Sequence, residues 1–241
     1  MEWRDEGVII GVRPHGETSV IAEIFTADHG RCLGMVRGGR SRQQRPVLQP
    51  GNLVMATWRA RLEEHLGTFQ IEGLSLKAGF ILSHGLRLAG MNTLMSLCQL
   101  LPEREPHEKL YHAAHVVLSA MDNDDVWPAL LVRWEMGLLD ELGFGLDLSR
   151  CAATGQVDDL GYVSPRSGRA VSRSAGAAYH DKLFVLPSFL NGGDGHSPLE
   201  VLDGFRLTGF FLKRHVFAPR QLDMPSARAW LFEGLQEQMA A

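Results

Sequence analysis

The sequence predicts an α+β protein: an N-terminal five-stranded barrel, then an α-helical bundle domain that contains an irregular insert. Residues 1–76 hold short β-branched or alternating runs, apolar residues return every three or four positions after Lys77, and residues 149–195 show no sustained period. The chain of 241 residues is 45% hydrophobic and 22% charged, which is typical of a folded globular protein.

The runs in residues 1–76 predict five strands, each bounded by turn residues such as Pro14, Gly30 and Pro50. The predicted strands are Gly7–Val12, Ser19–Phe25, Arg31–Arg37, Asn52–Leu62 and Gly67–Leu76. Five strands with one long loop between the third and the fourth suit a barrel of the OB type. An SH3-like barrel has a compatible strand count and stays open as the alternative. We therefore expect an OB-fold domain in residues 1–78.

After Lys77 the apolar residues follow a helical period, and we expect a helical domain in residues 79–241. The predicted helices are Phe80–Leu101, Glu108–Met121, Trp127–Leu142, Leu199–Phe217 and Ala227–Met239. Ser197 and Glu200 are spaced as a capping box, with Pro198 at the first helical position. Residues 149–195 are rich in Gly, Ser and Arg, and we expect an insert there because a bare loop of that length is rare.

Several functional classes lack their usual motifs in this chain. There is no phosphate-binding loop, no dinucleotide-binding glycine motif, and no zinc-protease or serine-hydrolase motif, so we do not expect an enzyme. No apolar run could cross a membrane, and the charged start MEWRDEGVII does not resemble a signal peptide. The three cysteines form no C-x-x-C pair, which fits a reducing compartment. We therefore expect a cytoplasmic protein without a membrane partner.

Glu108, His112 and His115 are spaced to share one side of a predicted helix. Three such side chains could contribute to a metal site if a fourth ligand came from elsewhere. A Glu and a His four residues apart also form an ordinary surface pair, and we favour that interpretation. We predict no metal site here.

The segment VRGGRSRQQR, residues 36–45, concentrates positive charge in a chain whose net charge is −4. The stretch from residue 31 to residue 45 contains no acidic residue and five arginines, namely Arg31, Arg37, Arg40, Arg42 and Arg45. Guanidinium groups bind phosphates, and Gly38 and Gly39 would let the main chain approach a phosphate backbone closely. The pattern predicts nucleic-acid binding that is largely independent of base sequence. A solvated loop without a ligand is the alternative.

Other cationic residues are expected to extend the same surface. In the predicted fourth strand, Arg59 and Arg61 share one face, while Trp58 points to the other face. Arg13 lies at the first predicted turn and is expected to add to the patch. Trp58 could stack on a base, as aromatic residues do in barrels that bind single strands, but packing in the core is the favoured reading.

Two distant segments of the chain resemble the RecO family of bacterial recombination mediators. EGVIIGVRPHGETSVIAEIFTADHGRCLGMVRGGRS is similar to that family's first three strands and basic loop, and LVRWEMGLLDELGFGLDLSRCAATG to its central helix and the segment after it. The resemblance covers nearly the whole chain. It implies an OB-fold followed by a helical bundle interrupted by a zinc-ribbon-like insert. It further implies ATP-independent binding of single- and double-stranded DNA and annealing of complementary strands, in cooperation with RecR and the single-strand-binding protein, so that RecA can load. A nucleoid-associated location in the cytoplasm follows.

The insert departs from the pattern of many family members, which carry four cysteines as two C-x-x-C pairs. Here Cys151 is kept, while Thr154, Ser172 and Ala175 stand where the other three cysteines would fall. One thiolate cannot complete a tetrahedral zinc site. We therefore predict a degenerate ribbon without zinc, held by the packing of apolar neighbours such as Tyr162 and Val163.

Two further sites are expected from the insert and from the resemblance, and two other functions stay open as alternatives. The insert offers a possible second DNA contact at Arg166, Arg169 and Arg173. A groove between helices would bind the acidic C-terminal tail of single-strand-binding protein, framed by residues such as Arg133, Arg206, Lys213 and Arg214. The alternative functions are an RNA-binding barrel protein of translation or ribosome maturation and a protein-interaction scaffold.

Overall fold

The computed structural model describes residues 1–62, 64–81, 83–193 and 195–240 of the chain. Residues 82, 194 and 241, which fall in the predicted first helix, insert and helical domain, lie outside the described residues. By its contacts the chain divides into two compact units, Met1–Met121 and Asp122–Ala241, which are described separately below. The OB-fold domain boundary predicted after residue 78 stays a prediction.

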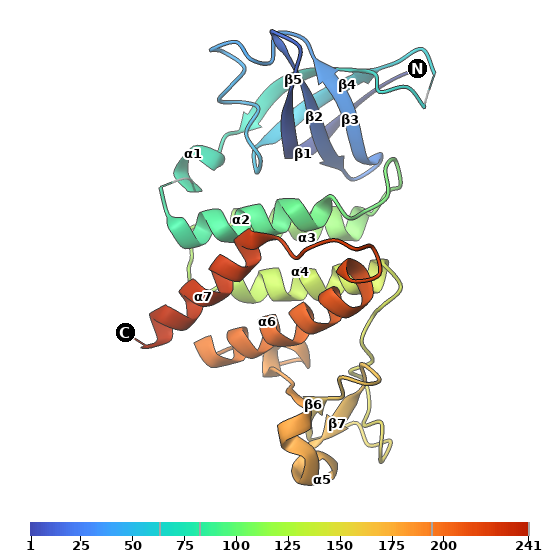
Figure 1. Ribbon diagram of the computed structural model, residues 1–241, viewed down its shortest axis with the longest axis vertical. Coiled ribbons are helices and arrows are strands. Elements are labelled where there is room, and N and C mark those ends of the chain that lie inside the picture. The colour runs from blue at the N-terminus through green and yellow to red at the C-terminus, as the bar shows by residue number, and fades with distance from the viewer. Residues whose placement is uncertain (63, 82, 194, 241) are drawn as a thin grey trace. The chain divides into compact units, whose positions relative to one another are not determined.

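Five strands near the N-terminus form a closed ring in the order β1-β2-β3-β5-β4 (Figure 1). They are β1 (Glu2–His15), β2 (Ser19–Thr26), β3 (Gly30–Val36), β4 (Leu53–Arg59) and β5 (Thr68–Ser75). The long β1 pairs antiparallel with both β2 and β4. The ring is closed by a parallel contact between β3 and β5 at Met35 and Thr68. All five predicted strands are therefore confirmed, with different ends.

The ring closes around an apolar core because alternate side chains of each strand point inward. Its buried residues include Ile9, Ile24, Val54, Trp58 and Phe69. β1 is longer than predicted because its charged start continues the alternation. Glu2 and Arg4 lie opposite Arg59 and Thr57 of β4, while Trp3 packs against the core. A strand whose outer face is charged is missed when strands are predicted from runs of apolar residues.

Three helices complete the first unit: α1 (Ala78–Ile81), α2 (Gly85–Cys98) and α3 (Glu108–Ser119). The prediction of one helix over Phe80–Leu101 is wrong, because His84 is extended, with φ −127° and ψ 110°, directly before α2. The predicted helix over Glu108–Met121 is confirmed as α3. Both longer helices contact the ring. Gln99 donates to the Ile10 carbonyl at 3.2 Å, and the ring of Tyr111 meets that of Phe25 edge to face.

The second unit contains three long helices, α4 (Trp127–Glu141), α6 (Pro198–Leu212) and α7 (Ser226–Ala240). α6 continues into a π-helical stretch, η3 (Lys213–Phe217), so the predicted range Leu199–Phe217 is helical throughout. The capping box is confirmed: the backbone N–H of Glu200 donates to Ser197 Oγ, and the Glu200 carboxylate accepts from the Ser197 N–H. No helix among the residues described could cross a membrane.

The segment predicted to be irregular contains a small three-stranded sheet in the order β7-β6-β8. Its elements are β6 (Leu160–Val163), β7 (Ala170–Ser172), α5 (Arg173–Gly176), η1 (Ala177–Lys182), β8 (Phe184–Val185) and η2 (Ser188–Leu190). Each strand has at most four residues, which is too short for an alternating pattern to stand out. Val163 is fully buried and Tyr162 half-buried, as expected if packing holds the insert together.

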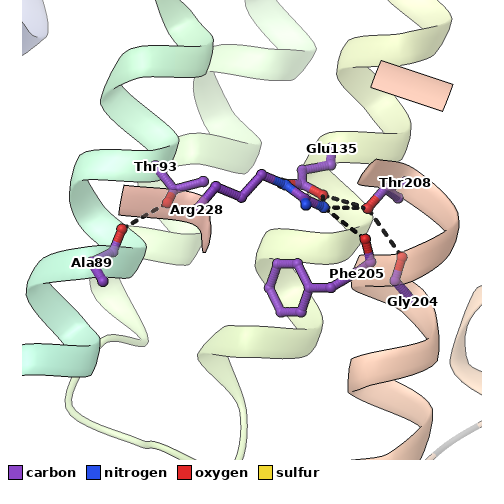
Figure 2. A network of polar contacts seen from close by, with 7 residues as sticks. All are labelled: Ala89, Thr93, Glu135, Gly204, Phe205, Thr208 and Arg228. Carbon is purple, nitrogen blue, oxygen red and sulfur yellow. Dashed lines mark hydrogen bonds and ion pairs between the residues drawn. The ribbon is translucent and has the colours of Figure 1, made fainter. Parts of the chain in front are cut away.

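A buried polar network joins α7 to α4 and α6 (Figure 2). Arg228 of α7 donates from Nε and Nη2 to the two carboxylate oxygens of Glu135, at 2.8 Å each. Thr208 donates to the same carboxylate, and Arg228 Nη2 also reaches the Phe205 carbonyl at 2.8 Å. Glu135 is fully buried and Arg228 is 8% exposed. A buried charge is tolerated only when it is paired and hydrogen-bonded, so this network fixes where α7 packs.

Replacing Arg228 by methionine should destabilise the protein by about 3–5 kcal/mol, because Glu135 would remain as an unpaired buried carboxylate. Replacing both partners, Glu135→Leu with Arg228→Met, should recover most of that loss. Urea unfolding followed by circular dichroism measures both. Arg166→Met, at an exposed arginine, is the control and should change stability by less than about 0.5 kcal/mol. A double variant less stable than the single one would contradict this account.

Candidate nucleic-acid interface

The basic loop between β3 and β4, residues 37–52, is folded and anchored to the ring. Backbone N–H groups of Arg45 and Leu48 donate to the carbonyls of Ser41 and Gln44, which builds helical turns. Leu48 is 4% exposed and belongs to the core of the ring. At the end of the loop, the fully buried Asn52 donates from Nδ2 to the carbonyls of Pro46 and Val47 at 2.9 and 3.0 Å. The arginines are therefore displayed by a defined segment.

The two glycines of the loop have different roles. Gly38 has φ +65°, a backbone conformation that suits glycine, and no atom lies within 4 Å of where a Cβ would be. Gly39 is buried, and a Cβ there would lie 2.6 Å from a methyl carbon of Val20. The expectation that both glycines let the main chain approach a ligand is thus wrong for Gly39. Its small size serves the packing of the loop on the ring.

Five of the seven predicted DNA-binding arginines on this unit are exposed and make no ion pair or hydrogen bond from their side chains to any described residue. They are Arg13, Arg37, Arg42, Arg45 and Arg61. Arg61 lies beyond the end of β4 at Arg59, so the strand argument that placed it beside Arg59 does not hold. Arg40 donates to the carbonyls of Gly16 and Glu17, at 3.3 and 3.0 Å, and keeps its charge unpaired.

Arg37 and Arg59 line one groove of about 530 Å³ on the wall formed by β3, β5 and β4. Its other outward side chains are polar and uncharged, namely Gln44, Thr57, Thr68 and Gln70. Arg59 is ion-paired with Glu2 at 2.8 Å, and both side chains are more than half exposed. Both groups are ionised at neutral pH, and the hydrogen bond from Arg59 lowers the pKa of the Glu2 carboxyl further below that range. Arg37 is thus the unpaired cation of this groove.

Two residues singled out in the sequence are used inside the fold instead. Arg31 is ion-paired with Glu23, donates to the Leu101 carbonyl at 2.7 Å, and is not part of the exposed basic cluster. Trp58 is 3% exposed and donates to the carbonyls of Leu33 and Leu66. Its ring is therefore core, which confirms the favoured of the two expectations for this residue.

The three insert arginines differ in whether a carboxylate pairs with their side chains. Arg169 is paired with Asp147 at 3.2 Å and Arg173 with Asp159 at 3.5 Å. Arg166 is exposed, and no described carboxylate pairs with it. Only one of these three cations is thus uncompensated within the fold.

The four residues expected to frame a peptide groove point to different segments of the second unit. Arg133 donates to the Phe189 carbonyl, Arg206 pairs with Asp203, and Arg214 donates to the Pro165 carbonyl. Lys213 is exposed at the start of η3. A groove of about 510 Å³ does lie between α4, α6 and α7, but its lining combines Asp124, Asp125, His196 and Gln238 with apolar side chains and contains none of these four cations.

The four positions of the degenerate ribbon converge, as the resemblance implies. The backbone N–H of Ser172 donates to Cys151 Sγ at 3.2 Å, and that of Ala175 to Ser172 Oγ at 3.4 Å. Burial raises the pKa of the Cys151 thiol, but hydrogen bonds from Ser172 and Thr154 outweigh it and lower the pKa to about 6. The thiolate is stabilised by N–H and O–H donors at the positions that cysteines would occupy around zinc.

Elsewhere among the described residues, no group of three or more His, Cys, Asp and Glu side chains is placed to hold a metal ion. His112 lies 3.7 Å from Glu108, and both side chains are largely exposed. This contact matches the surface pair favoured from the sequence.

The fold and the site define a class: α+β proteins in which a closed ring of strands, carrying a cationic loop, precedes a helical region. Two family models match the chain, "Recombination protein O N terminal" over residues 1–76 and "Recombination protein O C terminal" over residues 82–222. The chain belongs to the RecO family of DNA repair and recombination proteins, as its resemblance suggested. α7, from Ser226, lies beyond the matched residues.

Relatives along the whole chain carry the same family name. The chain is 54% identical to the "DNA repair protein RecO" of Mesorhizobium japonicum, over 100% of this chain and 96% of the relative. It is 52% identical to the proteins of that name from Methylorubrum populi and Rhizobium etli, over 95% of this chain and 96% and 90% of those relatives.

The Cys151 thiol should titrate near pH 6 in the native protein, which the far-ultraviolet absorbance of the thiolate measures. Because the folded pKa lies below the ordinary value of 9.0, ionisation adds stability above pH 9, and this contribution is lost as the pH falls through 6. Wild type should therefore gain stability relative to Cys151→Ser between pH 6 and 9.

The control is internal to the chain: burial raises the pKa of Cys32 to about 11, and it also raises that of Cys98. The Cys151→Ser variant should accordingly show no thiolate signal near neutral pH. A signal that persists in this variant would contradict the assignment to Cys151.

Proposed function

We propose that this protein binds single- and double-stranded DNA through the basic loop of its N-terminal ring and anneals complementary strands without ATP. The observation that carries the proposal is the set of exposed, unpaired guanidinium groups of Arg37, Arg42 and Arg45 on a loop anchored by Leu48 and Asn52. Cationic side chains that neutralise phosphates release counterions from DNA, which favours binding whatever the base sequence.

The ring itself is proposed to be an OB-fold, contained in a domain of residues 1–78. Its strand order, with β1 shared by β2 and β4 and a parallel β3–β5 closure, supports that type over an SH3-like barrel. OB-folds bind oligonucleotides on the face of strands 2 and 3 and with the loops that join strands 1–2 and 4–5. Arg40 is bonded to the first of these loops and Arg61 lies in the second.

Annealing by this arrangement needs no reacting side chain. Two DNA strands repel each other, and a protein that neutralises both lowers the cost of bringing them together, after which base pairing provides the driving force. The net charge of −4 does not oppose this, because exposed charges act over about one Debye length, ~10 Å at moderate salt. The protein would act as a mediator and not as an enzyme.

Membership of the RecO family supports the proposed partners, RecR and single-strand-binding protein, and through them RecA. Arg166 and its neighbours Arg169 and Arg173 would form the second DNA contact, with Arg166 the cation left free for it. The acidic tail of single-strand-binding protein would contact Arg133, Arg206, Lys213 and Arg214 individually, since none of them lines the groove between α4, α6 and α7. These proposed activities would be carried out at the nucleoid in the cytoplasm, without a membrane partner.

The triple variant Arg37→Gln, Arg42→Gln, Arg45→Gln should lose most annealing activity. Its binding of single strands should also depend less on salt. If each arginine neutralises one phosphate, the slope of log K against log salt should become less negative by about 2. Annealing of complementary oligonucleotides, bare or coated with single-strand-binding protein, and titrations across a salt series measure both effects.

The matched control removes three exposed cations elsewhere: Lys109→Gln, Arg150→Gln and Lys182→Gln. It changes the net charge equally and should retain annealing and the salt slope. Unchanged annealing in the loop variant would favour the scaffold alternative. Tighter binding of structured RNA than of single-stranded DNA would favour the RNA-binding alternative.

The variant Glu2→Gln should bind single-stranded DNA about two- to threefold more tightly at low salt, because it releases Arg59 into the groove that holds Arg37. The gain should disappear at high salt, where exposed charges are screened. Glu108→Gln makes the same charge change on α3, paired there with His112, and is expected to leave the affinity unchanged. Equal gains from both variants would mean that net charge, and not Arg59, sets the affinity.

A further inference from the structure

A second groove, of about 350 Å³, lies between the ring and α2 within the first unit. One side is formed by β1, β2 and β3, with Arg13 at the β1–β2 end, and the other by three polar side chains from α2 and the residue that directly follows it. These are Asn92, Ser96 and Gln99, which are spaced four and three apart and so face the same way. None of them belongs to the predicted DNA-binding residues.

The polar groups of this groove differ in whether the fold already uses them. Gln99 is committed, because it donates to the Ile10 carbonyl at 3.2 Å, and a Cβ at position 11 would lie 2.6 Å from its amide nitrogen, which glycine avoids. Asn92 and Ser96 are half-buried, and their side chains make no hydrogen bond to any described residue. One wall of the groove therefore presents a carboxamide and a hydroxyl that are available to a ligand.

The other residues that line the groove suit a flat aromatic group of a ligand with an anionic group beside it. Val12, Leu33, Pro50 and Met95 supply apolar surface. The Glu23 carboxylate in the groove is ion-paired with Arg31, so it does not repel an anion as a free carboxylate would. Arg13 is exposed and unpaired at the rim. Carboxamides pair with the donor and acceptor edges of bases, and arginine binds phosphate.

We propose that this groove binds an unpaired nucleotide of single-stranded DNA, with the base against Asn92 and Ser96 and its phosphate on Arg13. The inference rests on the proposed function, because it gives the same DNA a second point of contact. The groove adjoins the basic loop: Pro50 lines the groove and belongs to the loop, and Arg40 of the loop is bonded to the β1–β2 turn that follows Arg13.

The position of the groove gives the ring two strand contacts on different walls. The Arg37–Arg59 groove lies over β3, β5 and β4, whereas this groove lies over β1, β2 and the side of β3 toward α2. A strand held here exposes its other bases, while a second strand is held electrostatically on the far wall. The groove admits a base only from a single strand, because bases in a duplex are paired and stacked.

The test compares the double variant Asn92→Ala, Ser96→Ala with wild type, using fluorescence anisotropy of one oligonucleotide that carries bases and one of equal length made of abasic residues. Loss of two hydrogen-bonding groups should weaken binding of the base-bearing strand about five- to tenfold. Binding of the abasic strand and of duplex DNA should not change, and neither should the salt slope. Arg13→Gln should weaken binding of both single strands and lower the salt slope by about 0.7.

Two controls separate the outcomes. Thr57→Ala, Gln70→Ala removes similar polar groups from the other groove and should affect base-bearing and abasic strands equally. Circular dichroism melting shows that each variant is folded. Suppose that the loop variant at Arg37, Arg42 and Arg45 loses binding, but the Asn92→Ala, Ser96→Ala variant binds base-bearing and abasic strands as tightly as wild type does. The groove assignment is then overturned, and the proposed function stands. If the loop variant also binds as wild type, the proposed function itself fails.

Discussion

The buried side chain of Asn52 joins the end of the basic loop to the start of α1 and so fixes the segment that carries the cationic face. Its amide donates to the carbonyls of Pro46 and Val47, at the end of the basic loop, and its oxygen accepts from the Ala78 N–H at 3.1 Å, where α1 begins. A fully buried amide is costly unless each of its groups is bonded, so this side chain permits one arrangement of loop and helix. The loop arginines need no contacts of their own to stay in place, and their charges remain available.

Burial separates the arginines that serve the fold from those whose side chains stay free for a ligand. Arg31 and Arg228 lie in or near the interior, and each has a carboxylate and a backbone carbonyl as partners. Desolvation makes such pairing obligatory, whereas an exposed guanidinium group keeps its hydration and needs no partner. Composition alone does not separate these two kinds of arginine. The acidic excess of the chain is therefore compatible with a locally cationic surface on the ring.

The strands, the three long helices of the second unit and the cap at Ser197 could be predicted because local sequence determines them: alternation, helical period and a side-chain hydrogen bond three residues away. The sheet of the insert could not, since strands of two to four residues leave no measurable period. The roles of Arg31 and Arg59 depend on Glu23 and Glu2, which lie far along the chain or on another strand. The groove at Asn92 also needs tertiary structure, because a polar face on a helix ordinarily predicts only exposure to solvent.

A protein that anneals strands must hold DNA weakly enough to release it into the duplex. Stacking in DNA contributes about 1.4 kcal/mol for each base-pair step, and a protein that bound every base as firmly would oppose pairing. Phosphate neutralisation avoids this conflict, because the phosphates stay exposed in both single strand and duplex. In the proposed role the ring meets this requirement: Trp58 is buried and unable to stack on bases, while the proposed base contact is one groove with two uncommitted polar side chains. One such contact can orient a strand and still release it when base pairs form.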